Sequence, residues 1–291
     1  MQTIRHFVFS VVLTFSFLPA FCQNSILWEV SGNGLDHPSY LLGSLKFIGE
    51  KEYFLPKEIV DRIKTSQLFA IEDEVNHHAQ HELNKAIHFP KGKSLASVLS
   101  PEDYNKVENF FLKEFKISQK KFKKNYATLK PLALSIAMTR LSLNEGVKFY
   151  DIELLKMANS LRIATFSLEP IEREAQAFNA FAVEDQAKAL LHSIDNFETQ
   201  KMEFKNLEAA YTEGDINRVF EYSLHPFENN QNFIEEFYYK RNEEWLPKIE
   251  KMFAEQKSFV TVGVTHLKGE KGLLNLLKSK GYILTPIAVT Q

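Results

Sequence analysis

The chain has 291 residues, a formal net charge of −2 and a single cysteine, Cys22. These numbers exclude a disulfide framework and a cysteine-rich zinc site, and the small net charge gives no indication of a nucleic-acid partner. Hydrophobic residues make up 44% of the chain and 25 residues are phenylalanine, so we expect a core large enough to hold the fold without disulfides.

The first segment has the pattern of a secretory signal peptide. A short basic start around Arg5 is followed by an uncharged apolar run from residue 7 to residue 21. Ala20 and Cys22 place small residues three and one positions before a cut at Gln23. The pattern therefore predicts export of the mature chain.

Cleavage of residues 1–22 would leave residues 23–291 as a single domain. A lipoprotein cut before Cys22 is the weaker alternative, because the residue preceding that cysteine is bulky. No later stretch is long and apolar enough to span a bilayer, so we expect no integral membrane span after removal of the signal.

The mature chain opens with two β-prone segments, residues 26–30 (ILWEV) and 39–47 (SYLLGSLKF). The turn-rich residues 31–38 (SGNGLDHP) separate them, which predicts a hairpin. Residues 55–66 (LPKEIVDRIKTS) have the spacing of a short amphipathic helix, and residues 67–75 (QLFAIEDEV) are typical of a buried strand that ends in acids.

Helical signals dominate the middle of the chain. Ser100 followed by Pro101 is typical of a helix start, and apolar residues then recur at helical spacing up to Phe115. Residues 151–170 predict a helix, a turn and a strand. Residues 171–254 are mostly helical, with a break where Gly214 ends one helix and the next residue caps another.

The end of the chain predicts a strand over residues 258–267, a turn and helix over 269–281, and a final strand over 282–289. Strands at both ends with helices between them predict an α/β or α+β fold. We expect a mixed central β-sheet flanked by helices, with a mainly helical insertion in the middle.

Polar side chains end four of the predicted strands: Lys46, Glu72 to Glu74, Glu169 and His266. Loops at the carboxyl ends of strands open a crevice above the sheet, which is the usual place for a site in such folds. One imidazole, one ammonium and several carboxylates would suit a hydrolytic or metal-binding cluster. The commoner alternative is that such acids are solvated or cap helices.

Several blocks of the chain resemble the TraB/GumN family, which includes the Tiki proteases. Residues 27–45 (LWEVSGNGLDHPSYLLGSL) and 55–72 (LPKEIVDRIKTSQLFAIE) resemble its opening, and residues 146–169 (GVKFYDIELLKMANSLRIATFSLE) resemble its middle motif. The segments YTEGD, YKRNEEWLPKI and VTVGVTHLKGEKGLLNLLKSKGY resemble its later blocks in the same order. The resemblance covers nearly all of the mature chain.

The mark of that family is a pair of Gly-x-x-His motifs and a glutamate that ends the strand after the first motif. In this chain the second motif is intact from Gly263 to His266, and the glutamate is Glu72. Arg241 and Asn242 match a late Arg-Asn pair. The Tiki branch implies metal-dependent peptide hydrolysis from these groups.

The first motif is broken, because Gly43-Ser44-Leu45 is followed by Lys46 rather than histidine. A milder departure is Glu174, at a position where the family often has glutamine. The resemblance implies catalytic roles for Glu72, His266, Arg241 and Lys46, with Glu72 and His266 as metal ligands. It further implies substrate contacts from Gly43, Ser44, Glu169, Asn242 and Gly263.

Lys46 decides between the functional interpretations. An ammonium has no lone pair, so Lys46 would have to lose its proton to ligate Mn²⁺, Co²⁺ or Zn²⁺. We expect it to stay charged and to pair with Glu72 or Glu169. The favoured interpretation is a degenerate relative that binds a peptide or glycan in the former active-site crevice.

Two alternatives stay open. In one, the protein is an active metal-dependent hydrolase that holds its ion with His266, Glu72 and other carboxylates. In the other, a desolvated Lys46 acts as base or nucleophile.

Two further segments have chemistry of their own. His77 and His81 have a spacing that can bind zinc on a helix, but the HExxH glutamate is missing and a solvated face is favoured. Residues 113–125 (KEFKISQKKFKKN) could touch an anionic lipid or polysaccharide. A helix with a solvated face and a buried aromatic stripe is the favoured interpretation of that segment.

Overall fold

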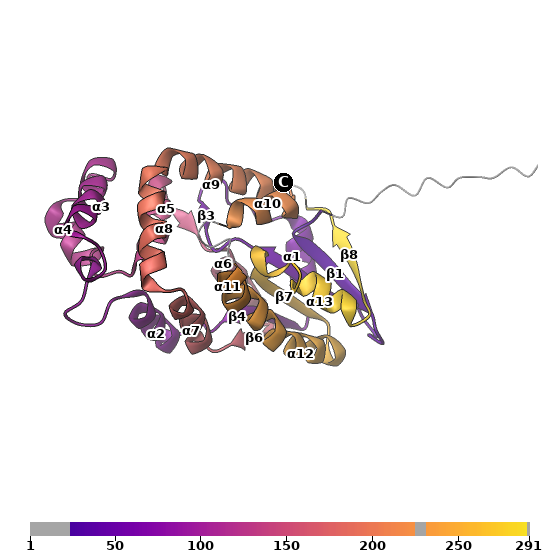
Figure 1. The fold of residues 1–291 in the computed structure, drawn as a ribbon. Coiled ribbons are helices and arrows are strands. Elements are labelled where there is room, and N and C mark those ends of the chain that lie inside the picture. The colour runs from indigo at the N-terminus through magenta and orange to yellow at the C-terminus, as the bar shows by residue number, and fades with distance from the viewer. Residues whose placement is uncertain (1–23, 225–230, 290–291) are drawn as a thin grey trace, which may run out of the picture.

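A mixed six-stranded sheet lies at the centre of the described residues, with strand order β6-β4-β7-β2-β1-β8 (Figure 1). The computed structural model describes residues 24–224 and 231–289, so the predicted signal peptide lies outside the described residues. The strands of this sheet are β1 (Leu27–Gly32), β2 (Ser39–Ser44), β4 (Leu68–Asp73), β6 (Ala164–Glu169), β7 (Ser258–Gly263) and β8 (Tyr282–Ile287). The α/β fold with a mixed central sheet is thereby confirmed.

Four neighbouring strands of the sheet run parallel. β4 pairs in parallel with both β6 and β7, and β7 pairs in parallel with β2. β1 is antiparallel to β2, with Leu27 opposite Leu42, which confirms the predicted hairpin. Because the four parallel strands point the same way, their carboxyl ends meet at one edge of the sheet.

The parallel strands form the main hydrophobic core. Every residue of β2 is buried, as are the first five residues of β4 and of β7. Such near-continuous burial is typical of parallel strands that are covered on both faces. Helix α6 contacts β4 and β6, α12 contacts β6 and β7, and α13 contacts β8. The helices around the sheet are α1 (Lys57–Lys64), α6 (Tyr150–Ser160), α12 (Lys240–Glu255) and α13 (Leu273–Ser279).

Most of the remaining helices form the helical lobe (Figure 1), which has its own phenylalanine-rich core. The buried side chains of residues 207–219 instead join the main core. Between β4 and β6 lie α2 (His77–Ile87), η1 (Leu95–Ser97), α3 (Pro101–Glu114), α4 (Gln119–Asn125), α5 (Pro131–Ser142) and the short strand β5 (Val147–Lys148). β5 pairs with β3 (Ile48–Gly49), which precedes β4 in the chain. Between β6 and β7 lie α7 (Ile171–Ala180), α8 (Val183–Asp195), α9 (Phe197–Thr212), α10 (Ile216–Ser223), α11 (Gln231–Ile234) and the π-helical turn η2 (Glu235–Tyr239). These segments confirm the predicted helical insertion.

Helix boundaries follow the capping residues that the sequence predicts. Ser100 accepts a hydrogen bond from the Asp103 amide at 3.1 Å and so caps α3, with Pro101 in its first turn. Gly214 has a positive φ of 71°, and Asp215 then caps α10. Among the described residues no helix combines the length and the apolar composition needed to cross a membrane.

The strand expected over residues 258–267 is shorter than the sequence predicts. β7 ends at Gly263, and Val264–His266 form the 3₁₀ turn η3. At this turn Val264 and Leu267 lie against Gly43 of β2. This turn carries His266 to the carboxyl edge of the sheet.

Gly43 allows that close approach. A Cβ at this position would lie 2.7 Å from Leu267 Cδ1 and 3.0 Å from the Val264 Cα atom. We therefore expect Gly43→Ala to lower the free energy of unfolding by about 1–3 kcal/mol, the usual cost of overpacking a core. Gly146→Ala is the matched control, because its Cβ would meet only the end of the exposed Glu50 side chain. Equal effects of the two changes in urea denaturation would contradict this packing.

Candidate functional site

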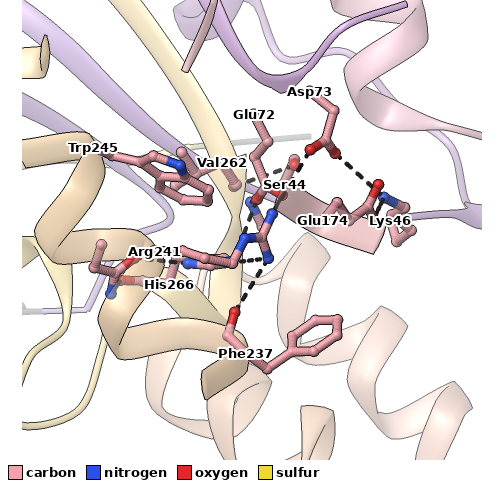
Figure 2. Close-up of polar contacts among 12 residues, drawn as sticks. Ser44, Lys46, Glu72, Asp73, Glu174, Phe237, Arg241, Trp245, Val262 and His266 are labelled. Atoms are coloured by element: carbon pink, nitrogen blue, oxygen red, sulfur yellow. Dashed lines mark hydrogen bonds and ion pairs between the residues drawn. The ribbon is translucent and has the colours of Figure 1, made fainter. Parts of the chain in front are cut away.

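The four strand ends singled out in the sequence meet in one cluster (Figure 2). Ser44 lies opposite Gly263 in the β2–β7 ladder, and Asp73 lies opposite Glu169 in the β4–β6 ladder. Two residues beyond Ser44 the chain reaches Lys46. The parallel register therefore places the two Gly-x-x-x motifs and the acids of β4 and β6 side by side.

Arg241, in the first turn of α12, lies at the centre of this cluster with its side chain 1% exposed. Its Nε donates to Glu169 Oε1 at 3.0 Å, and its Nη2 lies 2.7 Å from the same oxygen and 3.3 Å from Glu72 Oε2. Its Nη1 donates to the Phe237 carbonyl at 3.2 Å and to His266 Nε2 at 3.3 Å. Four hydrogen bonds therefore involve all three nitrogens of the guanidinium.

Aromatic rings hold the guanidinium in place. Its central carbon lies 4.8 Å from the Trp245 ring and 5.5 Å from the Phe237 ring. Trp245 also donates its indole N–H to Glu169 Oε2 at 2.7 Å, so both oxygens of that carboxylate are bonded. The preceding turn, η2, is π-helical, a geometry that recurs at functional sites.

Asn242 fixes the orientation of His266. The Asn242 amide nitrogen donates to the carbonyls of His266 and Lys271, at 3.1 and 2.9 Å, so its oxygen is free to accept from His266 Nδ1 at 2.7 Å. This network assigns the proton to Nδ1 and leaves a lone pair on Nε2. Burial and the nearby Arg241 charge lower the pKa of His266 well below its ordinary value, so the imidazole is neutral.

Lys46 does not pair with Glu72 or Glu169, so the predicted partners were wrong. Its ammonium lies 3.0 Å from Glu174 Oε1 and 3.9 Å from Asp73 Oδ2 (Figure 2). The two expected partners are unavailable because the buried guanidinium already pairs with both.

The two positions at which the chain departs from the family pattern therefore contact each other. The Glu174 carboxylate, and to a smaller extent that of Asp73, raises the pKa of Lys46 above its ordinary value. Burial disfavours the Glu174 carboxylate, but the charges of Lys46 and Arg241 together lower the pKa of that group. This environment keeps Lys46 charged and opposes a role as a neutral base or nucleophile.

Asp73 and Asp151 also belong to the site. The sequence placed Asp73 among the strand-end acids but gave neither residue a functional role. Burial and the Glu174 charge raise the pKa of Asp73 well above its ordinary value, and its Oδ1 has no hydrogen-bond partner among the described residues. Asp151 accepts a hydrogen bond from Ser44 Oγ at 2.6 Å. Burial, together with the Glu72 charge, raises the pKa of Asp151 to about 6. The signal in the sequence that could have identified both residues is an acid that follows a buried strand or lies on a helix packed against one.

The residues expected to contact substrate fall mostly in the buried part of this site. Gly43 lies beneath Leu267, and Glu169 and Asn242 are buried behind the guanidinium. The Gly263 amide donates to Glu72 Oε1. The site thus has an inner layer of fully bonded groups and an outer layer, which we call the mouth, formed by Lys46, Asp73 and Glu174.

The metal-ligating atoms of the site can be compared with those that a divalent ion needs. Glu72 Oε1 and His266 Nε2 lie 3.8 Å apart, so the two ligands that the resemblance implies do come together. Zinc sites in proteins take at least three protein donors, and the group at the first-motif position is an ammonium. Within residues 24–224 and 231–289, no three His, Cys, Asp or Glu side chains are grouped so as to hold a metal ion. The residues present therefore do not fit Mn²⁺, Co²⁺ or Zn²⁺.

The histidines of α2 lie outside this cluster. His78 Nε2 contacts Glu172 of α7 at 2.8 Å, and His81 Nδ1 contacts the adjacent Glu82 at 3.1 Å. The side chains of His78 and His81 are largely exposed. The solvated helix face favoured from the sequence agrees with this arrangement.

Comparisons with known proteins give one result. A family model described as the TraB/PrgY/gumN family matches residues 26–286. No curated protein and no solved structure matches the chain.

The buried guanidinium makes a strong prediction about stability. Arg241→Met leaves Glu72 and Glu169 buried without their cation, so we expect the free energy of unfolding to fall by about 3–5 kcal/mol. Arg218→Met, which breaks the exposed pair with Glu213, is the control and should change the urea midpoint little, because exposed ion pairs contribute little to stability. Similar urea midpoints for the two variants would contradict the central place of Arg241.

The raised pKa of Asp151 makes stability depend on pH. The folded protein keeps this proton up to about pH 6, whereas the ordinary value is 3.8, so the folded state binds more protons between these limits. Stability should therefore fall as pH rises through this range. Asp151→Asn removes the free-energy cost of burying a charged carboxylate above about pH 6. We therefore expect it to stabilise the protein by about 1–3 kcal/mol at pH 8 and not at pH 4. A pH-independent difference in urea denaturation would refute the assignment.

Proposed function

The chain belongs to the TraB/PrgY/gumN family, and we propose that it is an exported member that binds a peptide or glycan without metal-dependent cleavage. The proposal has two parts, the loss of the metal site and the use of the mouth for binding.

The contact between Lys46 and Glu174 carries the first part. Arg241 matches the family pattern, so it cannot by itself set this chain apart from a metal-dependent relative. Lys46 does so, because its ammonium stands at the position of the first-motif histidine and pairs with Glu174 at 3.0 Å. A divalent ion beside Glu72 and His266 would acquire no third donor and would be repelled by a positive charge.

Internal cations explain why such a site would stay folded without an ion. Five carboxyl groups surround the cluster: Glu72, Asp73, Asp151, Glu169 and Glu174. Arg241 and Lys46 offset part of that negative charge. The raised pKa values of Asp73 and Asp151 reduce it further, because these two acids keep their protons to higher pH. The Lewis acid that a hydrolase would use is thereby replaced by groups that cannot polarise a scissile carbonyl in the same way.

The mouth supplies the groups for binding. The Lys46 side chain is 61% exposed, and the carboxylates of Asp73 and Glu174 are each 13% exposed. A cation beside two acids can donate to and accept from the polar groups of a peptide backbone or a sugar. All three guanidinium nitrogens of Arg241 are already bonded within the inner layer, so this layer serves to hold the mouth rigid.

Metal dependence separates this proposal from an active hydrolase. We expect the melting temperature of the mature protein to be unchanged by Mn²⁺, Co²⁺ or Zn²⁺ at tenfold excess. The double variant Lys46→His/Glu174→Gln supplies a third metal-ligating side chain. It also removes the Glu174 carboxylate, which would have no cation partner once Lys46 is replaced. The same ions should therefore stabilise this variant. Adding His266→Ala to that variant should abolish the gain.

Turnover and binding are measured on the same proteins. Wild type should leave fluorescein-labelled casein uncut with or without these ions, and should bind spots on a peptide or glycan array that Lys46→Glu no longer binds. Stabilisation of wild type by a metal, lost in His266→Ala, or metal-dependent casein cleavage would reject the proposal in favour of the hydrolase.

A further inference from the structure

The outer end of the helical lobe carries a concentrated positive charge. Residues 113–125 contain six lysines and one glutamate, whereas the whole chain has a formal charge of −2. The six lysines are all exposed: Lys113, Lys116, Lys120, Lys121, Lys123 and Lys124. We call this surface the lysine tip. It lies on α3 and α4, at the end of the molecule away from β1 and β8 (Figure 1).

Aromatic packing holds the lysine tip in a defined shape. Phe122, the buried residue of α4, lies 5.3 Å from the Phe111 ring of α3 and stacks on Tyr126 at 6.3 Å. Lys120 and Lys124 are one helical turn apart, and at about 100° per residue both point away from Phe122. The hydrophobic side of the segment thus faces inward and its lysines face solvent.

The lysine tip is poorly neutralised by the chain itself. The nearest acid to Lys123 is Glu108, at 3.9 Å, and that carboxylate already accepts from Gln119 at 2.9 Å. Lys116 donates to a backbone carbonyl. In the part of the chain that the structure describes, the other four ammonium groups have no carboxylate within ion-pair distance. An unneutralised cluster of this density attracts a polyanion.

The chemistry of the lysine tip favours a lipid surface among polyanions. It has no arginine, so it lacks the planar fork that grips individual phosphates or base edges. Its aromatic side chains pack inward, so no ring is available to stack on nucleic-acid bases. A set of flexible point charges at one end of the molecule suits a plane of anionic headgroups, where each lysine contributes independently.

We propose that the lysine tip is a docking surface for membranes that contain anionic lipid, and that it holds the protein at the membrane without a spanning helix. The tip docks end-on, so the mouth of the site at the sheet edge stays open to solvent while the protein is bound. Binding is electrostatic, and salt weakens it.

Vesicle co-sedimentation tests the proposal with the mature chain, residues 23–291. The probes are vesicles of phosphatidylcholine alone and vesicles with 30% phosphatidylglycerol, at low and high salt. Wild type should prefer the anionic vesicles at low salt and lose that preference at high salt. The triple variant Lys120→Gln/Lys121→Gln/Lys124→Gln should bind them at least about tenfold more weakly, since each lysine near the surface contributes of the order of 1 kcal/mol.

The matched control is Lys64→Gln/Lys278→Gln/Lys280→Gln, which removes the same charge from exposed positions on or next to α1 and α13. It should bind like wild type, and unchanged melting temperatures of both variants would show that the fold is intact. Equal loss in the control would overturn the proposal, as would the absence of any preference for anionic vesicles. Tighter binding to duplex DNA than to the anionic vesicles at the same salt would also overturn it.

Discussion

The site and the sheet around it depend on one buried cation. Arg241 joins the carboxyl ends of β4 and β6, through Glu72 and Glu169, to the turn after β7, through His266. All three nitrogens of its guanidinium are hydrogen-bonded, and two aromatic rings lie close to the group. Removing water from such charges is costly, so the arrangement is stable only while all of its partners are present.

This rigid inner layer explains how the mouth of the site can change without loss of the fold. Lys46 and Glu174 sit outside the guanidinium, contact solvent, and compensate each other's charge. A substitution at either position alone would leave an uncompensated charge beside Asp73. If the proposed function is correct, two substitutions at the mouth are enough to separate a metal-free binding site from a metal-dependent one on the same scaffold.

The sequence predicts the scaffold well, because its signals are local. The hairpin of β1 and β2, the cap at Ser100 and the break at Gly214 each depend on residues that are neighbours in the chain. The strand-end acids also came together, since parallel strands place their carboxyl ends at one edge. The partner of Lys46 was not predictable in this way, because Glu174 belongs to α7, and its approach to β2 depends on how the helical lobe folds. The early end of β7 likewise depends on tertiary contacts over Gly43.

The most direct test of the account is anomalous X-ray scattering from crystals of the wild-type protein soaked in MnCl₂ and measured above the manganese edge. The account predicts no anomalous peak within bonding distance of Glu72 Oε1 and His266 Nε2, with Lys46 paired to Glu174 in the same electron density. A peak bonded to both atoms, with Lys46 displaced from Glu174, would contradict the claim that the chain's own cations stand in place of a metal.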